Sequence, residues 1–103
     1  MGEDIERARH RARAIEKRVE EARRSLAGRV VEGQAGGGLV RASVTGDQRV
    51  LSIEIVPEAI DPARAAELKA LVLEAVNDGL ARSKELTRAV LAQATGGARI
   101  PGM

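Results

Sequence analysis

The chain has 103 residues, enough for one domain, and it contains no Phe, Trp or Tyr. Large core side chains must therefore be Leu, Ile, Val or Met, and so thin a core is often completed by a second subunit. The net charge of +2 is mild, but eight of the seventeen Lys and Arg residues lie between Arg7 and Arg24. The lack of cysteine excludes disulfides and cysteine nucleophiles. The charged N-terminal region and the lack of long apolar runs predict neither a signal peptide nor a membrane span.

Residues 3–27 are predicted to form one helix. Its apolar residues are spaced alternately three and four apart, which is the pattern of a coiled-coil seam. The seam consists of Ile5, Ala8, Ala12, Ile15, Val19, Ala22 and Leu26. Gly28 supplies the stop signal. Because the seam is narrow, this helix must pack against another helix or a sheet to be stable.

Residues 29–56 are predicted to form a three-stranded antiparallel meander. The first β-prone run is Arg29–Gly33, followed by a glycine-rich turn at 34–38. Apolar and polar residues then alternate over 40–45 and again over 51–55, with a tight turn between them at 46–48. The open edges of so small a sheet invite pairing with another copy.

Residues 61–95 are predicted to form a long helix that begins with Asp61 as N-cap and Pro62 in the first turn. Its stripe of apolar and small residues includes Gly79, where another backbone could approach closely. Residues 96–103 are expected to be a flexible tail. The chain is thus predicted to be a single α+β domain, 1–103, in the order helix, meander, long helix.

The outer face of the first helix carries a basic stripe. His10, Lys17 and Arg24 lie farthest from the seam, and Arg7 and Arg13 flank that line. The planar guanidinium of Arg suits phosphate because it donates two hydrogen bonds at once. The alternative is a solvated face held by intrahelical ion pairs, for which Glu3–Arg7 and Glu20–Arg24 have favourable spacing.

The remaining motifs do not predict an active site. The glycine run lacks the Lys-Ser/Thr of a phosphate-binding loop and leads into a strand, so it is interpreted as a turn. His10 is the only histidine, and no serine or acid has a recognisable catalytic partner. Without aromatic side chains to stack on bases, a nucleic-acid partner would be duplex DNA recognised by backbone or shape.

The order of motifs resembles the YbaB/EbfC family of nucleoid-associated proteins over nearly the whole chain. The resemblance rests on the run Gly33–Val40, the strand that ends in Pro57, the pair Asn77-Asp78 and the terminal Pro101-Gly102. It implies a homodimer joined through the sheet and the long helix, with projecting helices that bind DNA with limited sequence preference. It implies no cofactor and no enzymatic activity.

The hypothesis is therefore a cytoplasmic, nucleoid-associated homodimer that contacts duplex DNA through backbone phosphates, with no metal, membrane or small-molecule partner. The resemblance transfers DNA contacts to Arg7, Arg9, Arg11, Arg13, Lys17, Arg18 and Arg24 of the first helix, and to Arg82, Lys84 and Arg88 of the long helix. The alternative is a homodimeric coiled-coil module that binds another protein and not DNA.

Overall fold

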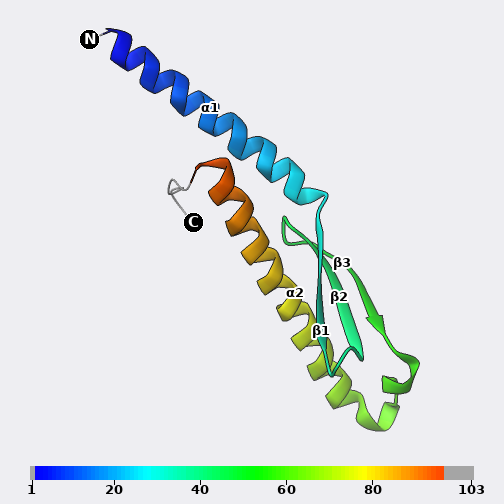
Figure 1. The fold of residues 1–103 in the computed structure, drawn as a ribbon. Coiled ribbons are helices and arrows are strands. Elements are labelled where there is room, and N and C mark those ends of the chain that lie inside the picture. Colours follow the sequence, from blue (N-terminus) through cyan, green and yellow to red (C-terminus); the bar gives the residue numbers. More distant parts are fainter. Residues whose placement is uncertain (1, 97–103) are drawn as a thin grey trace.

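The computed structural model describes residues 2–96. Helix α1 (Gly2–Ala27) is followed by strands β1 (Val30–Ala35), β2 (Val40–Thr45) and β3 (Val50–Ile55). Two short 3₁₀ turns, Pro57–Ala59 and Pro62–Arg64, lead into helix α2 (Ala65–Ala94). The strands form one antiparallel sheet in the order β1-β2-β3. This arrangement confirms the predicted α+β fold of helix, meander and long helix (Figure 1).

The β1–β2 hairpin explains the glycine run. Three consecutive glycines, Gly36, Gly37 and Gly38, have φ angles of 64°, 67° and 95°, a left-handed conformation that other residues adopt only at a cost. Strand β1 continues to Ala35, two residues beyond the predicted strand end at Gly33, so the turn is shorter than expected. Gly33 therefore lies inside the sheet, with Ala42 of β2 as its cross-strand neighbour.

The start of α2 also differs in detail from the prediction. The side chain of Asp61 accepts a hydrogen bond from the N–H of Ala63 at 3.0 Å, as an N-cap does. The capped turn is the 3₁₀ turn Pro62–Arg64, and the α-helix begins only at Ala65. The cap therefore stabilises the entry into the helix and not its first α-helical turn.

Helix α2 packs across β1 and β2 on one face of the sheet (Figure 1). The core cluster is small: Ala35, Val40, Ala42 and Ala75 are buried, and Leu68, Leu71 and Val72 pack against them. In register, Ile53 of β3 lies opposite Ala42, so its side chain is on the same face of the sheet. Ile53 nevertheless remains 43% exposed, because α2 lies over the first two strands and not over the third.

Two glycines set the distance between α2 and the sheet. A Cβ atom on Gly33 would overlap the backbone N of Gly79 and the backbone O of Ala75. A Cβ on Gly79 would lie 2.6 Å from Cγ2 of Val44. The backbones of strand and helix are thus in direct contact, as the glycine in the predicted helix stripe had suggested. Close contact of this kind lets a core made of Ala and Val be well packed.

Helix α1 is attached to the body only at its C-terminal end. Leu26 is buried, and its carbonyl accepts a hydrogen bond from the N–H of Gly46 at 3.1 Å. The β2–β3 turn is held in place by α2, because Ser83 Oγ donates to the Thr45 carbonyl at 2.6 Å and Thr87 Oγ1 donates to the Gly46 carbonyl at 2.7 Å. From this junction α1 projects as an arm, which gives the molecule extents of 74 × 20 × 16 Å (Figure 1).

We predict that Gly33→Ala destabilises the fold by about 2–3 kcal/mol, because the added methyl group must push the backbones of β1 and α2 apart. Urea unfolding monitored by circular dichroism would measure the loss. Gly28→Ala is the matched control, because a Cβ there meets its nearest atom only at 3.7 Å. Equal stabilities of the two variants would show that the contact between Gly33 and Gly79 is not a constraint.

Candidate nucleic-acid interface

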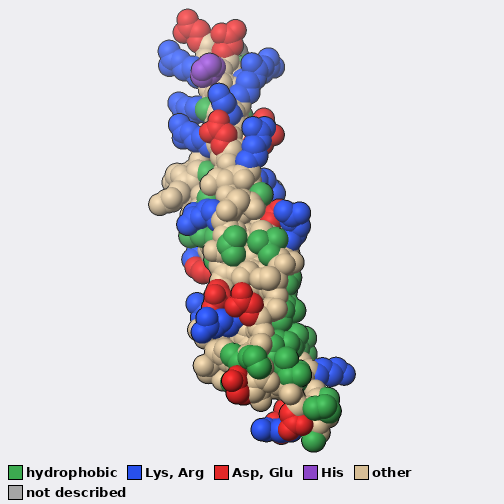
Figure 2. Space-filling view, turned by 90° about the vertical axis from the view of Figure 1, so that its right-hand side faces the viewer, with side chains coloured by type: hydrophobic (Ala, Val, Ile, Leu, Met, Phe, Trp, Pro, Cys, Tyr) green, Lys and Arg blue, Asp and Glu red, His purple; other side chains and the backbone are tan. Residues whose placement is uncertain are grey.

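The excess positive charge of the protein lies on α1. Outside residues 2–27, acidic and basic residues are equal in number, so the net charge of +2 belongs to this helix. Between Arg7 and Arg18 there are six Lys and Arg residues and one acid, Glu16. Figure 2 shows these basic side chains gathered around the projecting arm, whereas acids and bases are mixed over the body. The arm is therefore the cationic element of the molecule.

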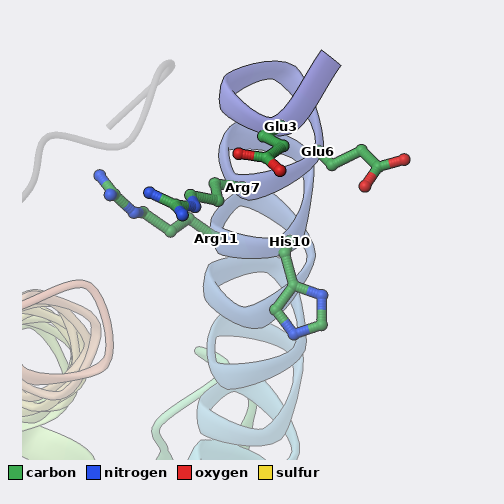
Figure 3. Close-up of a pocket in the computed structure, with 5 residues that line it drawn as sticks. All are labelled: Glu3, Glu6, Arg7, His10 and Arg11. Carbon is green, nitrogen blue, oxygen red and sulfur yellow. The ribbon is translucent and has the colours of Figure 1, made fainter. Parts of the chain in front are cut away.

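The helical spacing sorts the cations of the arm into rows. Arg7, Arg11 and Arg18 lie on one flank, and Figure 3 shows Arg7 and Arg11 extending together to the same side. Glu6 points to the other side, and His10 lies between the two directions (Figure 3). Glu3, Glu6, Arg7, His10 and Arg11 line a shallow surface pocket. This pocket mixes acids with bases and lies open on an exposed helix.

Ion pairs divide the ten predicted DNA contacts into two groups. Arg24 pairs with Glu20 at 3.0 Å, Arg82 with Asp78 at 3.2 Å, and Arg88 with Glu85 at 2.5 Å. The other seven make no ion pair within residues 2–96, and all are exposed: Arg7, Arg9, Arg11, Arg13, Lys17, Arg18 and Lys84. The expected Glu20–Arg24 pair is present, whereas the expected Glu3–Arg7 pair is not. The unpaired cations are concentrated in the N-terminal two thirds of α1.

The apolar seam of α1 is covered along only part of its length. Leu26 is buried and Val19 and Ala22 are half-buried, because the end of α2 lies beside this part of the arm (Figure 1). Ile5 is 53% exposed and Ala8 and Ala12 are exposed as well. The requirement that the helix pack against another element is thus met only at its C-terminal end.

A second apolar surface was not predicted from the sequence. Ile53 of β3 lies opposite Ala42 and is exposed on the face of the sheet that carries α2, and Leu51, two residues before it at the bulge of β3, is exposed as well. On α2, Val76 and Leu80 lie on the flank opposite Asp78, and Asp78 contacts the outer edge of β1. Val76 and Leu80 therefore flank β3, and the four residues form what we call the β3 face. Figure 2 shows hydrophobic side chains gathered along the body on this side.

Asp78 ties α2 to the free edge of β1. Its Oδ2 accepts hydrogen bonds from the backbone N–H of Gln34 at 3.0 Å and from Nε of Arg82 at 3.2 Å. The hydrogen bond from Gln34 is the main cause that lowers the pKa of Asp78. Partial desolvation of the carboxylate raises this pKa, and the nearby Arg82 lowers it further. In the sequence, the Asn77-Asp78 pair carries only a family resemblance. The structure gives Asp78 a role in holding the edge strand.

Other kinds of site find no support in the described part of the chain. Within residues 2–96, no group of three or more His, Asp or Glu side chains is arranged to hold a metal ion. No helix in this range is long and apolar enough to cross a membrane.

A small α+β body with a projecting cationic helix defines a class of protein suited to a polyanionic partner. Comparison with known proteins gives the family: a sequence profile of the YbaB/EbfC DNA-binding family matches residues 1–98. The chain is also 44% identical over 78 residues to a nucleoid-associated protein of Desulforamulus reducens, covering 76% of this chain and 74% of that one. This protein belongs to the YbaB/EbfC DNA-binding family.

Two further comparisons extend over the fold. The chain is 37% identical over 100 residues to a nucleoid-associated protein of an Anaeromyxobacter species, covering 97% of both chains. The crystal structure of an uncharacterized Helicobacter pylori protein matches with a TM-score of 0.61 at 22% identity, covering 76% of this chain and 89% of that one. The crystal structure supports the fold alone, whereas the family profile and the sequence relatives support the resemblance seen in the motifs.

We predict that Asp78 makes the stability of the fold depend on pH in the acid range. Because its pKa is lowered in the folded state, its contribution is present above the unfolded value of about 3.8 and is lost as the pH falls below it. Comparing the unfolding free energies of the wild type and Asp78→Asn from pH 7 to pH 2 would measure this. The wild type should be the more stable at pH 7, and the difference should shrink below about pH 4. A difference that stays constant over this range would contradict the assignment.

Proposed function

We propose that this protein is a homodimer that binds duplex DNA in the bacterial nucleoid, with the α1 arm contacting backbone phosphates. The observation that carries this proposal is the run of exposed arginines on α1 that have no carboxylate partner within residues 2–96, on a helix that projects from the body. Family membership and the names of the nucleoid-associated relatives support the same partner.

The charges on the arm favour phosphate contacts over base recognition. Arg7 and Arg13 lie on either side of the outermost line of α1 and can meet a phosphate without breaking an ion pair. Such contacts gain affinity from the release of counterions and carry no sequence information. Arg82 and Arg88 of α2 would have to leave Asp78 and Glu85 first. We therefore assign Arg82, Arg88 and Arg24 a secondary contribution to DNA binding. Lys84 has no ion pair within residues 2–96 and can contact a phosphate directly.

The β3 face supports the homodimer. Leu51 is 55% and Ile53 is 43% exposed, beside Val76 and Leu80 of α2. A contiguous apolar surface of this kind marks an interaction site, and a core without aromatic residues gains most from additional burial. The opposite face of β3 carries Ser52 and Glu54 and is polar. A second copy that covers the β3 face would complete the core that one subunit leaves thin.

The competing function is a coiled-coil module that holds another protein, without enzymatic activity in either case. Mixed charges on α1 and the exposed seam at Ile5 favour it. It differs from the proposal in one measurable way, because a protein-binding module requires no salt-dependent affinity for DNA.

We predict that Arg7→Ala/Arg13→Ala weakens DNA binding and lowers the slope of log affinity against log salt by about 2, one for each phosphate contact removed. Fluorescence anisotropy with a labelled duplex of arbitrary sequence, measured over a salt series, gives both quantities. The loss should be similar for unrelated duplexes, because the contacts are to the backbone.

The control for this experiment removes the same charge from the body. Arg49 and Arg64 are ion-paired with Asp47 at 3.6 Å and Glu67 at 2.7 Å, away from the arm. Arg49→Ala/Arg64→Ala should keep the wild-type salt slope. If the two double variants lose affinity equally, the arm is not the contact surface, and if the wild type does not bind DNA at low salt, the DNA-binding function is wrong.

We predict that Leu51→Glu converts the dimer to a folded monomer, because a carboxylate buried in an apolar interface is strongly unfavourable. Sedimentation equilibrium would show the mass fall by half, and circular dichroism would show that the helices persist. Ser52→Glu, on the polar face of the same strand, is the matched control and should remain dimeric. A dimer that survives Leu51→Glu but not Ser52→Glu would place the interface on the other face of the sheet.

A further inference from the structure

The exposed half of the α1 seam requires its own explanation, separate from the DNA contact. The stripe through Ile5, Ala8 and Ala12 faces away from the outer arginines and is not covered by any residue of 2–96. Helix α2 ends at Ala94, beside the middle of α1, so the N-terminal half of the arm extends past it (Figure 1). A free amphipathic helix of this length is marginal in water unless its apolar face is covered.

We propose that the N-terminal halves of two α1 arms, from two copies of this chain, pair with each other in parallel through Ile5, Ala8, Ala12 and Ile15. The spacing of these residues is that of a coiled-coil seam, and the two alanines allow the helix axes to approach closely. The occupant of the free seam is then the same segment of the other subunit, so this pairing rests on the proposed homodimer and adds to it.

The charges beside the seam favour this occupant and this orientation. In the heptad notation abcdefg, Ile5 and Ala12 are a positions, and Ala8 and Ile15 are d positions. In a parallel pair, the residue just before an a position lies near the residue just after the next d position of the other helix. Asp4 of one copy then lies beside Arg9 of the other, and Arg11 beside Glu16. Both pairs are attractive, both occur twice by symmetry, and none of the four side chains has an ion-pair partner within its own chain in residues 2–96.

The same reasoning disfavours the antiparallel pairing. When Ile5 is set opposite Ile15, residues of one flank face the same flank of the other copy. Asp4 then lies near Arg18, but Arg9 lies near Arg9 and Arg11 near Arg11. These like charges oppose association. Only the parallel arrangement therefore has opposite charges at every flanking pair of the N-terminal half.

The pattern also shows where the pairing ends. Continued toward the body, the next flanking pair would set Arg18 against Arg23, which is repulsive. At this same level Val19, Ala22 and Leu26 turn to α2 of their own chain. The two arms must therefore diverge beyond Ile15 to leave room for α2. The outer residues Arg7, His10, Arg13 and Lys17 remain free, so pairing would place two phosphate-binding surfaces side by side.

Disulfide crosslinking tests the contact without DNA, and the chain has no native cysteine to interfere. In the parallel pair, Ala8 lies opposite Ala8 of the other copy, so the purified Ala8→Cys protein should crosslink under mild oxidation. Ala14→Cys, on the outer face of the same helix, is the matched control. We expect Ala8→Cys to react at least about tenfold faster, because pairing raises the local thiol concentration.

Charge reversal tests the orientation. Asp4→Arg, added to Ala8→Cys, should slow crosslinking at low salt, and Arg9→Asp in the same chain should restore it. Equal rates for Ala8→Cys and Ala14→Cys would overturn the proposal, as would a mixture of Ala8→Cys and Ala12→Cys proteins that crosslinks faster with each other than either does alone. An unchanged rate in Asp4→Arg would also overturn it. Since no DNA is present, failure here is distinct from failure of the DNA-binding function.

Discussion

The contact between the backbones of β1 and α2 at Gly33 and Gly79 is the constraint on which the rest of the structure depends. Without Cβ atoms at these positions, helix and strand approach so closely that alanines and valines fill the space between them. A chain with no aromatic residue has few other ways to build a dense core. The contact also fixes the position of α2 over β1 and β2, which leaves β3 uncovered.

Polar contacts keep the helix in this position at both ends of the sheet. Asp78 accepts a hydrogen bond from the edge of β1, and Ser83 and Thr87 donate to the turn that follows β2. Because Leu26 and Gly46 meet at the same turn, the direction in which α1 leaves the body is set by α2 as well. The direction of the arm is therefore a consequence of core packing and not of α1 alone.

The arm combines two surfaces that would interfere if they overlapped. Phosphate binding needs cations that are hydrated and unpaired, such as Arg7 and Arg13. Helix pairing needs an apolar stripe with complementary charges beside it, as at Asp4 and Arg9. Helical periodicity places the first set on the outer side and the second beside the seam. One helix can thus take part in both proposed interactions, while the homodimer that we propose uses the β3 face of the body.

The amino-acid sequence by itself determined the local features of this protein. The spacing of apolar residues identified both helices and the strands β2 and β3, and a short β-prone run marked β1. The glycine run marked the β1–β2 turn, and Asp61 with Pro62 marked the entry to α2. These signals depend on residues a few positions apart, whose geometry is set by backbone periodicity. The concentration of arginine on the first helix was equally evident, because composition needs no fold.

The tertiary structure alone decided which of these surfaces are covered. The alternation in β3 resembles that in β2, yet Val44 is buried and Ile53 exposed, because α2 crosses only two strands. The seam of α1 is continuous in sequence but is divided where α2 ends. In the sequence, Arg82 and Arg88 cannot be told apart from Arg7 and Arg13. Only the structure shows that Arg82 and Arg88 already form ion pairs with carboxylates of α2. Burial and pairing depend on residues far apart in the chain, and such contacts have no periodicity from which they could be predicted.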